Sequence, residues 1–178
     1  MGLFDFFKKD KKEEQLSEDL SFKDLLPNDY VDYFLKSWRV EAAVEYDWGN
    51  NIFSREFKLN AGDEIIFVEI DEEEDSKVAI SKDIKLSKID KTLKTYIIEN
   101  DGPPKKLNFE GEEYFYAEES LGHCYDIGSE DYSELVSWTF NNEDESKFIS
   151  LSRWDETDIE SSVGEYAKII EFSNIIRS

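Results

Sequence analysis

Short runs of alternating apolar and polar residues, separated by turns of hairpin length, constrain the fold of this 178-residue chain more than any other feature. Runs of this kind predict half-buried β-strands. In the first half of the chain the predicted strands are Trp38–Tyr46, Ile52–Leu59, Ile65–Ile70 and Lys77–Ile80. Asparagine, aspartate and glycine fill the segments between them and favour tight turns. Because no β-α-β alternation appears, the pattern argues against a doubly wound fold and predicts an antiparallel sheet.

The same pattern resumes in the second half of the chain. The predicted strands there are Lys106–Phe109, Tyr114–Ala117, Leu135–Phe140 and Lys147–Arg153. The last apolar stretch, Val163–Ile176, fits a helix and a strand equally well, and periodicity alone does not decide between them.

One helix is predicted between the two sets of strands. Leu86, Ile89, Leu93, Tyr96 and Ile97 recur at the spacing of a single helical face, and the segment 100–104, Asn-Asp-Gly-Pro-Pro, ends it.

A helical lead-in is predicted before the first strand. Residues 13–26 are charged and loosely helical in spacing, and Asp29–Lys36 is predicted as one short helix. We therefore divide the chain into an amphipathic, charged N-terminal segment, 1–26, and a single β-rich domain, 27–178.

A weak internal repeat relates two of the predicted hairpins at an offset of 81 residues. Three positions are identical and four exchange one apolar residue for another; the first copy runs from Phe57 to Ile70 and the second from Trp138 to Leu151. The predicted fold class is α+β and mostly antiparallel β. Its sheet is a sandwich or is barrel-like, built from two similar hairpin units, with one inserted helix and the helical lead-in.

The composition excludes several classes of function. The chain has 43 acidic and 21 basic residues, a net charge of −22, whereas a general nucleic-acid binder needs clustered basic residues to displace counterions from phosphates. Its only cysteine, Cys124, excludes an internal disulfide, and with its only histidine, His123, leaves a Cys/His zinc site two ligands short. No apolar run approaches the roughly 20 residues of a membrane span. We predict no cofactor and no metal.

The N-terminus combines apolar and basic residues. Leu3, Phe4, Phe6 and Phe7 precede a basic stretch that includes Lys8 and Lys9. A secretory signal has the reverse order, and Phe6 stands where N-myristoylation requires serine or threonine. The segment is interpreted either as a weak peripheral membrane anchor or as a tail without that role. We expect a cytoplasmic protein, peripheral at the inner face of the membrane if the anchor is real.

No catalytic constellation is found. His123 and Cys124 are adjacent, so in a strand their side chains point to opposite faces. Acidic clusters such as Asp71–Asp75 and Glu118–Glu119 lack the spacing of a calcium loop. They are interpreted as solvated hairpin tips or as a surface for a cation or a basic partner. We therefore predict that the protein is not an enzyme; an enzyme that uses paired carboxylates or a bound cation is the remaining alternative.

Three of the four arginines lie beside aromatic residues: Arg39, Arg55 and Arg153. In a chain that prefers lysine, arginine indicates planar pairing or stacking. Two interpretations stay open: each arginine pairs with a carboxylate at the edge of the sheet, or the arginines anchor a recognition cleft with aromatic walls.

These arginine and aromatic positions resemble the bacterial family called domain of unknown function 4178, over about residues 38–170. The residues that carry the resemblance are Trp38, Arg39, Arg55, Phe57, Gly111, Tyr114, Arg153, Trp154, Gly164, Glu165 and Tyr166. The family has no established activity. The resemblance implies an accessory protein found beside phage-shock-protein-A-like membrane-stress proteins or polyamine-synthesis enzymes.

The function expected from the sequence is a non-enzymatic interaction or accessory domain that serves a membrane-stress or envelope-maintenance complex. We expect a protein partner, a weak membrane contact through the N-terminus, and no direct binding of nucleic acid. The alternative is an acidic mimic of nucleic acid that inhibits a DNA-binding enzyme through its charge. The sequence does not identify the partner or the oligomeric state.

Overall fold

The computed structural model describes residues 21–73 and 76–178, and every strand pair in this part of the chain is antiparallel. The strands are β1 (Tyr30–Tyr33), β2 (Lys36–Asp47), β3 (Phe53–Asn60), β4 (Ile65–Asp71), β5 (Lys77–Ile84), β6 (Lys106–Phe109), β7 (Glu112–Asp126), β8 (Tyr132–Asn141), β9 (Lys147–Arg153), β10 (Ile159–Lys168) and β11 (Phe172–Ile176). The helices are α1 (Leu86–Ile89) and α2 (Leu93–Asn100), with 3-10 turns η1 (Phe22–Asp24) and η2 (Ile169–Glu171). The predicted antiparallel, mostly β fold is confirmed.

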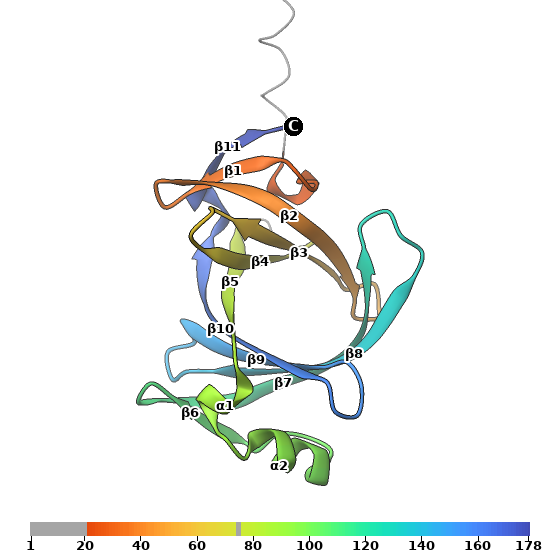
Figure 1. The fold of residues 1–178 in the computed structure, drawn as a ribbon, viewed down its shortest axis with the longest axis vertical. Coiled ribbons are helices and arrows are strands. Elements are labelled where there is room, and N and C mark those ends of the chain that lie inside the picture. The colour runs from red at the N-terminus through yellow and green to blue at the C-terminus, as the bar shows by residue number, and fades with distance from the viewer. Residues whose placement is uncertain (1–20, 74–75) are drawn as a thin grey trace, which may run out of the picture.

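The sheet closes on itself. Its strand order is β11-β1-β2-β3-β4-β5-β10-β9-β8-β7-β6, and an additional pairing joins β2 to β7. Eight strands, from β2 through β5, β10 and β9 to β7, therefore form a closed ring, while β1 with β11 and β6 extend from it (Figure 1).

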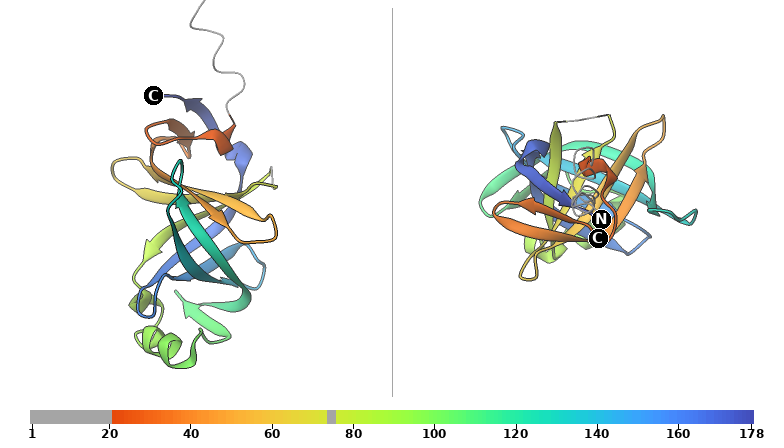
Figure 2. Two further views of the ribbon diagram at one scale, coloured as in Figure 1. Left: turned by 90° about the vertical axis from the view of Figure 1, so that its right-hand side faces the viewer. Right: turned by 90° about the horizontal axis from the view of Figure 1, so that it is seen from above.

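Apolar residues face outward from the ring and form two separate cores. One core contains buried side chains of β2–β5 together with Phe22, Leu25, Val31 and Phe172 from η1, the following turn, β1 and β11. The other contains buried side chains of β7–β9 together with Leu93 and Ile97 of α2 and Leu107 of β6. Figures 1 and 2 show β1 and β11 at one end of the molecule and α1 and α2 at the other. The elements outside the ring thus cover its apolar surfaces, while its interior combines many polar side chains with aromatic ones such as Phe67 and Phe148.

The prediction of a short helix over Asp29–Lys36 is wrong. This segment is β1 followed by a two-residue hairpin turn, because Phe34 and Leu35 both adopt positive φ (51° and 62°). Non-glycine residues rarely adopt this conformation, so turn chemistry did not reveal the hairpin. The helical N-terminal lead-in is not confirmed: residues 1–20 lie outside the described residues, and the described part contains only η1.

The single helix predicted between the strand sets is two helices. The carboxylate of Asp90 accepts hydrogen bonds from the backbone N–H and hydroxyl of Thr92, both at 2.7 Å, in a turn that separates α1 from α2. The predicted stop is confirmed, because Asp101 has φ 53° and the N–H of Gly102 bonds to the carbonyl of Ile97. The undecided C-terminal stretch is mostly strand, with β10 and β11 separated by η2.

Candidate functional site

The interior of the ring holds a cavity of about 930 Å³, which we call the lumen. Its walls are the inward faces of β3, β4, β5, β8, β9 and β10 together with residues 118–121 of β7. The wall is rich in hydroxyl groups, which are contributed by Ser54, Ser81, Ser120, Ser137, Thr139, Ser150, Ser152, Ser161 and Ser162. A polar interior of this size is within the range of small-molecule sites.

Seven carboxylates line the lumen: Glu56, Glu69, Asp71, Asp83, Glu118, Glu119 and Glu160. Within residues 21–73 and 76–178, none of them forms an ion pair with a lysine or arginine. The two lysines of the wall are engaged elsewhere. Lys58 pairs with Glu41 at 3.1 Å, and the ammonium of Lys77 lies 3.9 Å from the centre of the Tyr166 ring. The lumen therefore has an uncompensated negative charge.

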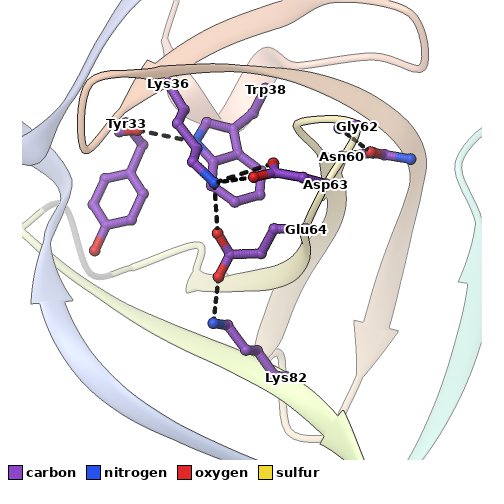
Figure 3. Close-up of polar contacts among 8 residues, drawn as sticks. All are labelled: Tyr33, Lys36, Trp38, Asn60, Gly62, Asp63, Glu64 and Lys82. Atoms are coloured by element: carbon purple, nitrogen blue, oxygen red, sulfur yellow. Dashed lines mark hydrogen bonds and ion pairs between the residues drawn. The ribbon is translucent and has the colours of Figure 1, made fainter.

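Two carboxylates outside the lumen, in contrast, form ion pairs with lysines. In the β3–β4 turn, the ammonium of Lys36 lies 3.0 Å from Asp63 and 3.1 Å from Glu64, and Glu64 also pairs with Lys82 (Figure 3). These contacts lower the pKa of Glu64. The chain thus supplies lysines to neutralise acids at this turn but not those inside the ring.

A hydrogen-bonded network lies at one side of the lumen, on neighbouring strands β2, β3 and β4. The Trp48 indole N–H donates to the Ser54 hydroxyl (2.9 Å), and this hydroxyl donates to Glu69 (2.5 Å). The Tyr46 hydroxyl donates to Glu56 at 3.2 Å. Burial and then the neighbouring Glu69 raise the pKa of Glu56 to about 8, and burial raises the pKa of Glu69 as well. At neutral pH the pair therefore retains a proton.

Two further acids meet from β5 and β10. Burial, followed by the charge of Glu160, raises the pKa of Asp83. Glu160 itself accepts a hydrogen bond from the Trp154 indole N–H at 2.9 Å. The raised pKa values of Asp83 and the Glu56–Glu69 pair have the same physical cause: burial comes first and a neighbouring carboxylate adds to it, and at Asp83 the nearby Lys58 offsets only part of this effect.

The arrangement favours a spread-out cation over a metal ion. In the described part of the chain, no three histidine, cysteine or acidic side chains are grouped closely enough to hold a metal. Carboxylates and hydroxyls distributed around a large cavity instead suit a ligand whose positive groups are separated from one another and can donate several hydrogen bonds each.

The His123–Cys124 dipeptide does not form a nucleophile–base pair. His123 contacts Glu134 at 3.7 Å and packs edge-on against the Tyr132 ring, while burial raises the pKa of the Cys124 thiol to about 11. A thiol with this pKa is protonated at neutral pH and is a poor nucleophile.

Two of the three arginines that lie beside aromatic residues in the sequence, Arg55 and Arg153, form ion pairs with carboxylates. The Arg55 guanidinium contacts Glu45 at 3.2 Å and Glu72 at 3.3 Å, and it donates to the carbonyl of Lys23 at 2.9 Å. Arg153 pairs with Asp101 at 2.8 Å. Carboxylate pairing is thus seen for both, but Arg153 also lies 5.2 Å from the centre of the Trp138 ring and lines a cavity with Trp48 and Trp154, so the interpretation as a cleft with aromatic walls stays open for it. Arg39 is exposed on β2.

Other residues of the family pattern pack in the cores or occupy positions in turns and strands that require glycine. Trp38, Phe57 and Tyr114 are buried in the two cores. Gly111 has φ 82° in the turn between β6 and β7, where a side chain would be strained. A Cβ at Gly164 would overlap the carbonyl oxygen of Ile80 and lie 2.6 Å from the Phe148 ring.

Only two residues of the family pattern, Trp154 and Tyr166, line the lumen. Glu165 lies beside Tyr166 in β10, opposite Ile80 and Lys147. The N-terminal candidates Leu3, Phe4, Phe6, Phe7, Lys8 and Lys9 lie outside the described residues.

Sequence reasoning missed the lumen itself. Glu118 and Glu119, interpreted as a solvated tip or binding surface, lie within strand β7 and line the cavity. The signal was present as polar residues on alternate positions of β3 (Ser54, Glu56, Lys58) and on β8 and β9 (Ser137, Thr139, Ser150, Ser152). Alternation alone does not say whether the polar face points to bulk water or into a closed ring.

Comparisons with known proteins place the chain in a family. Residues 26–168 match the profile of the family described as Domain of unknown function (DUF4178). Searches of the curated proteins and of the solved structures gave no match. No helix among the described residues is long and apolar enough to cross a membrane. The chain belongs to the DUF4178 family of domains of unknown function.

Proposed function

We propose that this domain is a non-enzymatic binding module that holds a small organic cation with two or more amino or guanidino groups in its lumen. The single observation that carries the proposal is the set of seven lumen carboxylates, none of them ion-paired within the described residues. Glu56 and Glu69 are partly buried, and charges in such places are costly unless they are paired, whereas the other five carboxylates are exposed and add negative potential. A ligand that brings the missing countercharge would therefore stabilise the site.

The wall supports the same ligand class. Hydroxyl groups supply hydrogen-bond acceptors between the carboxylates, and aromatic rings from Trp48, Trp154 and Tyr166 supply surfaces that attract cations. Tyr166 already demonstrates this within the chain, because the Lys77 ammonium lies 3.9 Å from the centre of its ring. A ligand amine would make the corresponding contact at the other rings.

A binding role is preferred over catalysis because the groups of the lumen do not form an acid–base–nucleophile set. The Glu56–Glu69 pair retains a proton, but no activated hydroxyl or thiol lies in hydrogen-bonding reach of a histidine among the described contacts. The raised pKa of the pair is what an empty cation site would give.

The proposal is tested by isothermal titration of the full chain with spermidine at low and high salt. We expect binding that weakens with salt. In the double variant Glu56→Gln/Glu69→Gln, we expect binding about 10- to 100-fold weaker, which corresponds to about 1.5–3 kcal/mol for a hydrogen bond to a charged group. Glu143→Gln is the matched control for single charge changes, because Glu143 is exposed in the β8–β9 turn. Absence of binding to the wild-type chain at low salt, or equal weakening in the control, contradicts the proposal.

We also propose the accessory role that the family resemblance implies, in a membrane-stress or envelope-maintenance complex with a protein partner. An exposed apolar patch supports a surface contact. Phe34 and Leu35 at the β1–β2 turn are 79% and 106% exposed, and Ile170 in η2 is 83% exposed.

Affinity capture from the source cells at low and high salt tests this accessory role. Recovery of only a basic DNA-processing enzyme, and only at low salt, would contradict the role and favour the nucleic-acid mimic. The mimic has less support, because seven of the acids line the lumen, and Asp63 and Glu64 are already paired with lysines.

We further propose that the β3–β4 and β8–β9 hairpins descend from one unit. Both contribute to the lumen wall, and the residues matched by the repeat keep the same face. The pairing differs by two residues, since Phe57 lies opposite Val68 whereas Trp138 lies opposite Leu151. A shift of two residues preserves the inward and outward faces of a strand, so both hairpins keep the same orientation toward the lumen.

A further inference from the structure

A second, more apolar cavity of about 530 Å³ adjoins the lumen. We call it the groove. Four residues line both cavities: Trp48, Leu121, Leu135 and Trp154. The two spaces therefore adjoin at these side chains, with the acidic lumen on one side of them and the groove on the other.

The two tryptophans at this junction are held in corresponding ways. Trp48 follows β2 in the hairpin with β3, and Trp154 follows β9 in the hairpin with β10. Each indole N–H donates to a lumen group six residues later, Trp48 to Ser54 and Trp154 to Glu160, both at 2.9 Å. Both N–H groups are thus directed to the lumen, which leaves the carbon faces of the rings to line the junction and the groove.

The position of Trp48 is fixed further by its neighbours. Its ring stacks on Tyr46 with the planes 19° apart, and it lies so close to Gly122 that a Cβ there would be 2.6 Å from the indole Cε3. Leu121, next to Gly122 in β7, is 67% exposed although it is a large apolar side chain. An apolar side chain left in solvent at the wall of a groove favours an apolar occupant, because its burial would be favourable.

We infer that the ligand is an amphipathic amine: its cationic part occupies the lumen and an apolar alkyl or aromatic part occupies the groove between Trp48, Trp154 and Leu121. This inference rests on the proposed function and adds the specificity of the same site. The Trp48–Trp154 junction separates the two parts of the ligand, so it determines where the charged part must end and the apolar part begin.

The test compares two probes of equal charge, 1,4-diaminobutane and N-hexyl-1,4-diaminobutane, by titration of the full chain. Each methylene that is buried gains about fourfold in affinity. We expect the hexyl probe to bind at least about tenfold more tightly, which requires burial of only part of its tail. Leu121→Asn should reduce this gain while leaving the affinity for 1,4-diaminobutane within about threefold of wild type. Trp154→Ala should also reduce the gain, but it should weaken both probes, because its ring and its hydrogen bond to Glu160 belong to the lumen as well. Leu121→Asn guards against misfolding, because its side chain is largely exposed.

Ile170→Asn is the matched control, since Ile170 is an exposed aliphatic residue of η2 that lines neither cavity. Equal affinity of the two probes overturns the inference but leaves cation binding in place. A gain that survives in both groove variants, or that is lost equally in the control, also overturns it. Failure of both probes to bind refutes the proposed function itself.

Discussion

Replacing Glu56 by glutamine should make the protein less sensitive to rising pH. In the folded chain the pKa of Glu56 is raised to about 8 from an ordinary value of 4.5, because the carboxyl is buried and lies near Glu69. The folded state therefore holds a proton that the unfolded state releases above pH 4.5. Stability from this group is complete below pH 4.5 and is lost progressively as pH rises to about 8.

The size of the stability change follows from the ordinary pKa of Glu56, 4.5, and its pKa in the folded chain, about 8. Each pH unit between them is worth about 1.4 kcal/mol, so ionising Glu56 costs up to about 5 kcal/mol. Glutamine has a similar shape, keeps an acceptor for the Tyr46 hydroxyl, and does not ionise. It also removes the repulsion that Glu69 experiences, although the cost of burying Glu69 itself remains. We expect Glu56→Gln to be about 2–5 kcal/mol more stable than wild type at pH 9 and nearly equal to it at pH 5.

The assay is urea denaturation of the full chain without added cations, followed by tryptophan fluorescence between pH 5 and pH 9. The difference between variant and wild type isolates Glu56 from the other titrating groups. Glu143→Gln, which removes an exposed charge, should run parallel to wild type. If Glu56→Gln also runs parallel to wild type, the account of the lumen as a site of uncompensated buried acids is refuted.

Three more predictions concern the lumen, the ring and the thiol. The affinity for 1,4-diguanidinobutane, whose guanidinium groups stay charged, should rise between pH 6 and pH 9 as Glu56 loses its proton, with proton release detected by calorimetry in buffers of different ionisation enthalpy; a flat profile would count against the site. Gly164→Ala should destabilise the chain by about 1–3 kcal/mol in urea, because the new Cβ overlaps the Ile80 carbonyl oxygen, whereas Gly102→Ala, with open space around it, should cost less than about 1 kcal/mol. Cys124 should react with iodoacetamide at pH 8 at least tenfold more slowly than a free cysteine, since its thiol pKa is raised to about 11; an equal rate would show that the thiol is not enclosed.

The strands could be predicted because each carries an alternating pattern with a turn at its end. The hairpins from β2 to β5 follow directly from this pattern, and Gly62 in the β3–β4 turn has the positive φ (95°) expected of a turn glycine. The β1–β2 hairpin could not be predicted, because its turn residues, Phe34 and Leu35, are not turn formers. The helix pattern over 86–97 was real, but the side chain of Asp90 interrupts it by bonding to Thr92.

The site could not be predicted because it depends on closure of the ring. The pairing of β2 with β7 joins segments about 80 residues apart, and no local pattern encodes it. Without this closure, the serines and glutamates of β3, β8 and β9 are indistinguishable from the solvated face of an open sheet. The family pattern marked residues that build the ring, such as Phe57 and Gly164, more than residues that line its interior.

The most direct test of cation binding in the lumen is a two-dimensional ¹⁵N–¹H spectrum of the full chain during titration with spermidine. The indole N–H signals of the tryptophans report on the lumen and on the apolar cores in the same spectrum. The indole N–H groups of Trp48 and Trp154 donate to Ser54 and Glu160 in the lumen, and that of Trp138 donates to Glu119 from the core beside α2. The indole N–H of Trp38 instead donates to the carbonyl of Tyr33 within the other core. We predict that the indole signals of Trp48 and Trp154 shift and saturate together with the amides of the lumen strands, while the Trp38 signal stays in place. Shifts confined to exposed turns, with both lumen indoles unchanged, would contradict the account.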